Sequence, residues 1–316
     1  MTIDDTQLTE ATTAGMQQIP AGRFLMGSEK FYPEEAPVRE VEVGAFWIDT
    51  YAVTNREYEH FVDETGYVTV AERPLNPADY PGALPGMLVP GALVFNQTQG
   101  PVDLRDWSQW WEYTPGACWR HPEGPGSSIR ARARHPVVHI AFEDAGAYAR
   151  WAGKRLPAEA EWEYAARGGL VGASFVWGEE MEPDGKPAAN TWQGDFPWQN
   201  LLTDGYERTA PVGTFLPNGY GLFDMAGNVW EWTTDWYVAR RAAAPSPCCS
   251  ASAEAHRERS YDPAFGDIRI PRKVVKGGSF LCAPNYCLRF RPAARSPQMI
   301  DTGMSHLGFR CVKDVE

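Results

Sequence analysis

Two cysteines, Cys282 and Cys287, lie five positions apart in a segment that opens with two glycines. Seven lysines and arginines, and no acidic residue, fall between positions 268 and 300, although the whole chain carries a formal net charge of −12. A local positive field favours thiolate over thiol and so lowers the pKa of a cysteine. Two neighbouring thiolates are soft ligands that suit Cu(I), and redox exchange is the other chemistry open to them.

On spacing alone, less reactive interpretations of this pair stay open. The thiols could be inert or joined in a local disulfide, and the basic residues could simply form salt bridges with the acidic remainder of the chain. Zinc is only a weak prediction, because structural zinc sites use a second pair of ligands and none follows at a suitable spacing.

A second candidate segment runs from Asp224 to Glu231, with Gly227 between the two carboxylates. Carboxylates and main-chain carbonyls together form the oxygen ligand set that Ca²⁺ prefers. An acidic turn before a Trp-x-Trp strand is the simpler interpretation. A similar but weaker pattern extends from Asn190 to Asp204.

The six histidines are scattered, and no His-Glu-x-x-His pattern occurs, so a histidine-bound iron or zinc centre is not predicted. His306 lies near the cysteines in the sequence, where a satisfied core histidine is favoured over a residue that orients a group. The chain also lacks G-x-S-x-G, Walker A and G-x-G-x-x-G motifs, which removes several common enzyme classes.

The elements that must position these residues are predicted to be short. The 316 residues include 30 glycines and 26 prolines, which interrupt regular structure, together with 13 tryptophans, 13 tyrosines and 14 phenylalanines, which supply a core. This composition predicts an α+β fold with a low content of regular secondary structure. Without an internal repeat or a linker, we expect a single domain over residues 16–316 and a disordered tail over residues 1–15.

Periodicity and capping residues indicate where the elements lie. Helices are expected after Thr54-Asn55, around residues 145–151 and over Glu159–Arg167. Strands are expected at residues 24–27, 41–43, 137–140, 274–276 and 307–311, whereas residues 72–134 look irregular.

The bulk properties exclude several partners. An acidic chain is a poor general ligand for nucleic acid or anionic membranes. The sequence contains no apolar run of membrane-spanning length and no secretory signal pattern at its start. We therefore expect a cytoplasmic protein whose cysteines stay reduced.

The segment Lys276-Gly-Gly-Ser-Phe-Leu-Cys-Ala-Pro-Asn-Tyr-Cys287, with its continuation to Ser296 and the closing Leu307-Gly-Phe-Arg-Cys311, resembles the active-site segment of formylglycine-generating enzymes (sulfatase-modifying factors). Further blocks resemble this family at residues 135–139, 151–157, 161–169, 189–194, 217–222 and 227–232. The resemblance extends over about residues 16–313. The tryptophan- and glycine-rich blocks occur across the wider superfamily and indicate the fold, whereas the two cysteines indicate the activity.

The resemblance implies a single formylglycine-generating-enzyme fold with a C-type-lectin-like core. It also implies a copper-dependent oxidase that converts the cysteine of a Cys-x-Pro-x-Arg motif in an unfolded sulfatase to Cα-formylglycine, with O₂ and a thiol reductant. Cu(I) would be held by Cys282 and Cys287, and the enzyme would be monomeric. The alternatives on the same scaffold are an iron-dependent sulfoxide synthase, against which the missing histidine triad argues, and a catalytically silent peptide- or carbohydrate-binding module.

Further site residues follow from the resemblance alone. The positions that line the family's active site fall on Ser279, Trp230 and Tyr286. The family's calcium ligands fall on two sets of residues: Asn190, Thr191, Asp204 and Tyr206 for the first ion, and Asp224, Gly227, Val229 and Glu231 for the second.

The chain departs from the family's pattern at several positions. The secreted animal members carry disulfide cysteines at the positions of Ala149, Ala166 and Pro292. Cys311 is therefore expected to be unpaired, in agreement with a reducing cytosol. Gly303 and His306 stand where a Ser and an Asn are usual near the site, a difference that bears on the peptide preference.

Overall fold

The computed structural model describes residues 13–84, 88–238 and 252–315. Within them the helices are α2 (Asn55–Thr65), α3 (Phe142–Trp151), α4 (Glu159–Arg167) and α5 (Ala253–Arg259). The strands are β1 (Met16–Ile19), β2 (Gly22–Met26), β3 (Arg39–Val43), β4 (Phe46–Asp49), β5 (Gly91–Phe95), β6 (Trp111–Pro115), β7 (Trp230–Trp236), β8 (Arg272–Lys276), β9 (Ser296–Met299), β10 (Leu307–Gly308) and β11 (Val312–Asp314).

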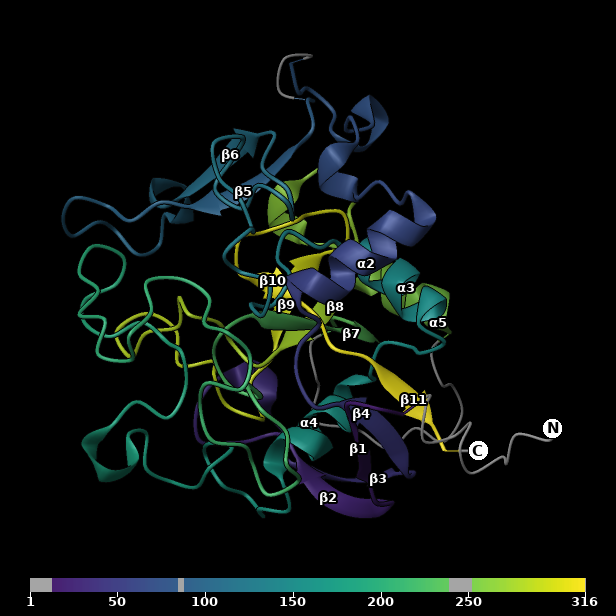
Figure 1. The fold of residues 1–316 in the computed structure, drawn as a ribbon, viewed down its shortest axis with the longest axis vertical. Helices are drawn as coiled ribbons and strands as arrows, with labels where there is room; N and C mark the ends of the chain where they lie inside the picture. Colours follow the sequence, from purple (N-terminus) through teal and green to yellow (C-terminus); the bar gives the residue numbers. More distant parts are fainter. Residues whose placement is uncertain (1–12, 85–87, 239–251, 316) are drawn as a thin grey trace.

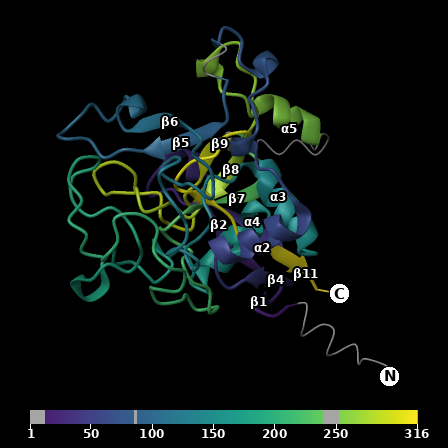
Figure 2. The same ribbon diagram turned by 45° about the horizontal axis from the view of Figure 1, so that its top comes forward.

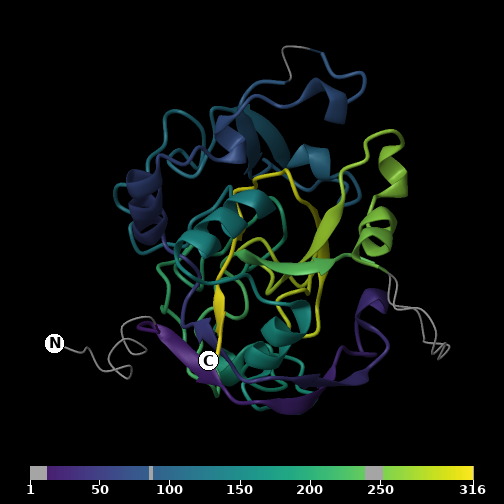
Figure 3. The same cartoon turned by 90° about the vertical axis from the view of Figure 1, so that its right-hand side faces the viewer.

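The strands form four small sheets. A four-stranded sheet has the order β10-β7-β8-β9, with β10 parallel to β7 and the other neighbours antiparallel. An antiparallel sheet has the order β1-β4-β11, and β2-β3 and β5-β6 form two-stranded ladders. The β2-β3 and β5-β6 ladders lie toward opposite ends of the molecule, with the four-stranded sheet between them (Figures 1 and 3).

Helices α2 and α3 pack together on one side of the molecule, where local sequence determines their ends (Figure 2). The Thr54 side chain accepts a hydrogen bond from the Glu57 backbone N–H, and the Glu57 carboxylate accepts one from the Thr54 N–H at 2.8 Å. Gly66 ends α2 in the left-handed conformation. Tyr58 and Phe61, three positions apart, turn the apolar face of α2 into the core.

The mixed architecture of short elements confirms the predicted fold class, but several local predictions were wrong. Residues 137–140 form no strand; Val137 makes a backbone hydrogen bond to Val53, outside any ladder. The segment 72–134, expected to be irregular, contains β5 and β6. The closing strand is split into β10 and β11, because Phe309 accepts a hydrogen bond from Val53 instead of continuing a ladder.

Some predictions concern residues outside the described part of the chain. They include most of the expected N-terminal tail, at residues 1–12. No helix of the described residues combines the length and the apolar character needed to cross a membrane.

Candidate active site

Cys282 and Cys287 lie on the turn that follows β8, and their Sγ atoms are 3.3 Å apart. A disulfide has an S–S distance of about 2.05 Å, so the two thiols are close but not bonded. Their exposed fractions are 2% and 8%, which shields the pair from general oxidants. The local-disulfide interpretation is therefore wrong for this structure.

The two glycines before the cysteines are required by the path of the backbone. Gly277 and Gly278 have φ angles of +92° and +73°, a region that other residues rarely adopt. A Cβ atom on Gly278 would lie 2.8 Å from the Cα of Phe290, on the returning side of the turn. The Cys282 backbone N–H then donates to the carbonyl of Ser279 at 2.9 Å, which closes the turn around the thiol.

Replacing Gly278 by Ala is expected to lower the free energy of unfolding by about 3 kcal/mol and to reduce activity with it. The substitution adds left-handed strain of about 1–2 kcal/mol to a collision with the Phe290 backbone. Gly266→Ala is the matched control, because Gly266 has φ +57° but open space around a Cβ. Urea unfolding measures both variants, and an equal loss in the two would show that packing against Phe290 contributes nothing.

The electrostatics of the pair are asymmetric. The pKa of Cys287 is lowered to about 7, chiefly by a hydrogen bond from Cys282 and also by the nearby Arg289 guanidinium, against the opposing effect of burial. The pKa of Cys282 is raised well above its usual value, first by burial and then by its neighbour. The pair therefore favours a state in which Cys282 keeps its proton and Cys287 is the thiolate.

The remaining basic residues do not provide the general positive field that their clustering suggested. Arg289 itself has a carboxylate partner, with its Nη2 2.6 Å from Glu34. The other ion pairs of this segment are Arg269–Glu258, Arg272–Asp262, Lys276–Glu163, Arg291–Glu35 and Arg295–Glu159. The salt-bridge interpretation is thus correct for most of the cluster, and only Arg289 acts appreciably on Cys287.

The structure brings the other predicted active-site residues close to the pair. Ser279 is fully buried, and its N–H donates to Cys282 Sγ at 3.4 Å. Trp230 belongs to the same buried cluster as the two cysteines. Tyr286 has an exposed fraction of 37%, and burial together with both thiols raises its pKa to about 12.

An aromatic cluster beside Tyr286 was missed by sequence reasoning. The Tyr286 ring stacks on Phe196 with a centroid distance of 4.4 Å, and Trp110 meets both rings edge-on. Phe95 packs against Phe196 from the other side. These rings come from four distant segments, so only their aromatic character, and not their spacing, could have indicated the cluster.

A cavity of about 520 Å³ lies between the cysteine turn and the segment of the first predicted calcium site. Pro284, Asn285 and Phe290 line it from the turn, and Thr191 and Gln193 line it from the opposite segment. The two sides are joined by a backbone hydrogen bond of 3.0 Å from the N–H of residue 192 to the carbonyl of residue 282. The segment 190–193 is therefore in direct contact with the turn that carries the thiols.

The first set of predicted calcium ligands contains an oxygen without a partner. Asn190 is 1% exposed, and its buried Oδ1 has no hydrogen-bond donor. Asp204 accepts hydrogen bonds from the N–H groups of Thr191 at 3.1 Å and Tyr206 at 2.9 Å, which gathers the four residues. The Gln193 amide nitrogen bridges the Thr191 carbonyl and the Asp204 carboxylate. The Thr191 carbonyl, the Asp204 carboxylate and the unpartnered Asn190 Oδ1 are oxygen donors of the kind that a hard cation prefers.

The second set is organised around a buried arginine. Glu231 accepts hydrogen bonds from Arg310 at 2.7 and 2.8 Å and from the indole N–H of Trp162 at 2.7 Å. Burial raises the pKa of Asp224 to about 6, with a smaller contribution from Glu231, so the two carboxylates influence each other. This set fits a cation less clearly than the first, because Arg310 already compensates Glu231.

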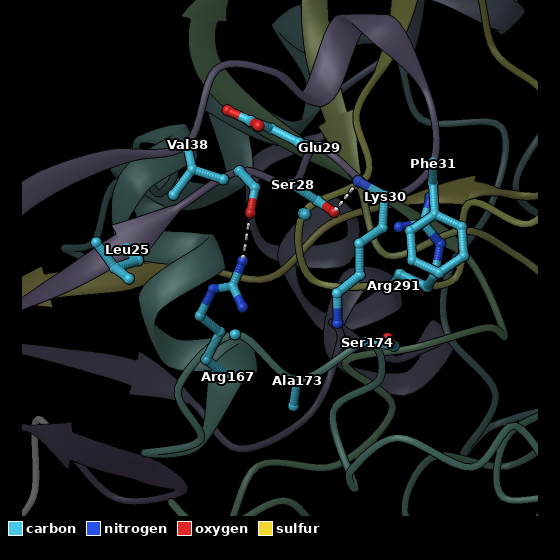
Figure 4. A pocket seen from close by; sticks show the side chains of 13 residues that line it. Leu25, Ser28, Glu29, Lys30, Phe31, Val38, Arg167, Ala173, Ser174 and Arg291 are labelled. Atoms are coloured by element: carbon cyan, nitrogen blue, oxygen red, sulfur yellow. Dashed lines mark hydrogen bonds between the residues drawn. The ribbon is translucent and has the colours of Figure 1, made fainter.

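Within the part of the chain that the structure describes, no three His, Cys, Asp or Glu side chains lie together as a metal cluster. A separate cavity has a volume of about 340 Å³. Three cationic side chains, Lys30, Arg167 and Arg291, line it (Figure 4). These cations already have carboxylate partners, in the pairs Arg167–Glu163, Lys30–Glu179 and Arg291–Glu35. We therefore assign no ligand to that cavity.

A comparison with protein families finds the sulfatase-modifying factor enzyme 1-like domain over residues 4–315, nearly the whole chain. The chain belongs to the sulfatase-modifying factor family. A formylglycine-generating enzyme of Mycobacterium tuberculosis is 56% identical over 297 residues, which cover 94% of this chain and 96% of that protein. The family also includes an inactive Cα-formylglycine-generating enzyme 2 of Mus musculus, 38% identical over 96% of this chain and 87% of that protein.

A solved structure supports the fold of the sulfatase-modifying factor family. PvdO of Pseudomonas aeruginosa superposes with a TM-score of 0.61 and 24% sequence identity, covering 95% of this chain and 94% of that one. This similarity concerns the fold alone. Because the family contains both active and inactive members, the chemistry of this chain must be argued from its own thiol pair.

Proposed function

We propose that this chain converts the cysteine of a Cys-x-Pro-x-Arg motif in an unfolded sulfatase to Cα-formylglycine, using O₂. The observation that carries the proposal is the pair of buried, unoxidised thiols 3.3 Å apart on a turn fixed by two glycines. The similarity to a formylglycine-generating enzyme at 56% identity supports it. Two soft sulfur donors at this distance suit Cu(I), which Cys282 and Cys287 would hold.

The protein's own residues prepare the thiol pair for this chemistry. Cys287 supplies a thiolate, because Cys282 and Arg289 lower its pKa to about 7. The Ser279 N–H holds the sulfur of Cys282. Burial of both sulfurs excludes bulk water from the site. Copper, when bound to the two cysteines, would supply O₂ activation beside the substrate thiol.

The overall reaction balances only with an external reductant. Conversion of a CH₂SH side chain to CHO by one O₂ releases H₂S and H₂O if two electrons and two protons are added. Two molecules of a thiol reductant supply them and leave as a disulfide. A stoichiometry of one O₂ and one disulfide per aldehyde formed is therefore part of the proposal.

Copper dependence separates this function from its alternatives. The purified protein is stripped of metal, loaded with Cu(I) or Fe(II), and supplied with a Cys-x-Pro-x-Arg peptide, O₂ and a thiol reductant. We expect O₂ consumption with copper only. Activity with iron alone would favour an iron-dependent enzyme, and peptide binding without O₂ consumption under either condition would favour a silent binding module.

We also propose that Ca²⁺ binds the first ligand set as a structural ion. A second Ca²⁺ would bind the second set, where Arg310 already compensates Glu231. The unpartnered Asn190 Oδ1 and the hydrogen bond between residues 192 and 282 support the first site and its connection to the cysteine turn. Saturating Ca²⁺ is expected to raise Tm by several degrees over the value in EGTA, since a ligand at about 100 times its Kd stabilises the native state by about 2.7 kcal/mol.

The variant Asp204→Ala tests the first calcium site, and Asp103→Ala is the control, because the Asp103 carboxylate is half exposed and pairs with Arg105 rather than with a residue of either set. Asp204→Ala should lose most of the Ca²⁺-dependent rise in Tm, while Asp103→Ala keeps it. An identical Tm in Ca²⁺ and EGTA for the unmodified chain would contradict the calcium proposal.

We also propose that the enzyme is monomeric and cytoplasmic. The four cysteines that the structure describes as free thiols, including Cys311, are compatible with a reducing compartment. Sedimentation and cell fractionation test these two points directly.

A further inference from the structure

His306, one of the departures from the family's motif, lies beside the cysteine turn and is held on two sides. Its backbone carbonyl accepts a hydrogen bond of 2.9 Å from the Trp230 N–H, next to the parallel pairing of β10 and β7. Its ring meets Trp111 edge-on with a centroid distance of 4.7 Å. Both the position and the plane of the imidazole are therefore restrained.

The contact with Ser279 bears on which ring nitrogen carries the proton. The Nδ1 atom of His306 lies 3.0 Å from Ser279 Oγ. That oxygen also accepts a hydrogen bond from the Leu281 N–H at 3.3 Å, and in the arrangement in which its own hydrogen is donated to the ring, Nδ1 is the acceptor. With Nδ1 as acceptor, a neutral imidazole carries its hydrogen on Nε2. Burial, with a smaller effect of His139, lowers the pKa of His306 to about 3, in agreement with a neutral ring.

The Nε2 atom is on the side of the ring away from Ser279 and is not completely buried. Ser279 is fully buried, whereas His306 is partly exposed and covers it. Among the described residues, no hydrogen bond to Nε2 is present, and Nε2 is not one of the fully buried polar atoms without a partner. Ser279 in turn connects His306 to the thiol site, because the Ser279 N–H donates to Cys282 Sγ.

We propose that His306 binds the substrate peptide, with its Nε2–H donating a hydrogen bond to a main-chain carbonyl oxygen close to the reacting cysteine. Ser279 is then a positioning residue that acts through His306, because its hydroxyl contacts Nδ1 of the ring. The inference rests on the proposed function, because its ligand is the Cys-x-Pro-x-Arg peptide. Main-chain carbonyls recur at every residue of an extended peptide, so this contact aids binding without selecting side chains.

Two substitutions distinguish the roles of the two ring nitrogens. The amide of His306→Asn takes the place of Nδ1, which keeps the contact with Ser279 but removes the outer donor. The longer side chain of His306→Gln places an amide N–H near the position of Nε2 but loses the contact with Ser279. The readouts are the Kd of an unreactive peptide with Ser in place of Cys, and kcat and KM for the reactive peptide. Both variants are first checked for an unchanged Tm.

His306→Asn is expected to weaken peptide binding and raise KM by about 3- to 10-fold, the effect of one neutral hydrogen bond, with the change on KM rather than kcat. His306→Gln should bind more tightly than His306→Asn. Equal losses in both, or wild-type affinity in His306→Asn, would overturn the inference, as would ¹⁵N spectra showing the proton on Nδ1. If the unmodified chain neither binds nor converts the peptide, the proposed function itself fails.

Discussion

Replacing either cysteine of the turn, by Cys282→Ala or Cys287→Ala, is expected to slow conversion of a Cys-x-Pro-x-Arg peptide by about 1,000-fold or more. Each thiol is half of the proposed copper site, and the loss of one group from a unit that acts together removes most of its catalysis. The remaining thiol also loses its partner at 3.3 Å, which alters its pKa. Single-turnover rates and bound copper per chain are measured together.

Cys118→Ala is the matched control for these variants. Cys118 is also a buried free thiol, with an exposed fraction of 5%, but it belongs to a different cluster, with Ala71 and with Ala92 and Val94 of β5. Its replacement should cost some stability and leave the rate within about 2-fold. Retained activity in both Cys282→Ala and Cys287→Ala would remove the proposed mechanism.

Arg310→Met is expected to lower the free energy of unfolding by about 3–5 kcal/mol, the usual effect of removing one partner of a buried ion pair. Arg310 is fully buried, and its guanidinium bonds to both carboxylate oxygens of Glu231 and to the carbonyls of Asp49 and Phe223. It thereby ties β7, which carries Trp230, to the β4 strand. The measurement is urea unfolding in EGTA, so that no cation replaces the lost charge.

The control for Arg310→Met is Arg23→Met, which removes an exposed arginine paired with Glu40 and Glu42 on the β2-β3 ladder. Exposed pairs contribute little, so the expected loss is within about 0.5 kcal/mol. A similar small loss in Arg310→Met would show that the buried pair does not hold the two sheets together. Partial recovery of its stability on adding Ca²⁺ would support the second calcium site.

Helix ends could be predicted where a capping residue or a glycine marks them. The predicted helix Glu159–Arg167 has the same bounds as α4, because Gly168 ends it in the left-handed conformation. The structure also explains the two glycines before Cys282, because a side chain at Gly278 would collide with Phe290. In such places a few neighbouring residues determine the backbone.

Contacts between distant segments could not be predicted in the same way. The basic residues after position 268 suggested a common positive field, but carboxylates from residues 34, 35, 159 and 163 neutralise most of them. Residues 137–140 look like a strand because they are apolar, yet they are buried without a ladder. The hydrogen bond from Ser279 to His306 spans 27 positions and depends on how β10 pairs with β7. Such contacts depend on the whole fold.

Mass spectrometry of a Cys-x-Pro-x-Arg peptide, incubated with the copper-loaded protein, O₂ and a thiol reductant, tests the central claim most directly. The proposed function predicts the mass change that corresponds to replacing CH₂SH by CHO, together with reactivity of the product toward an aldehyde-specific amine. The change should be absent without O₂ and in Cys282→Ala. An unchanged peptide mass with the fully loaded, correctly folded protein would contradict the claim that its thiol pair generates formylglycine.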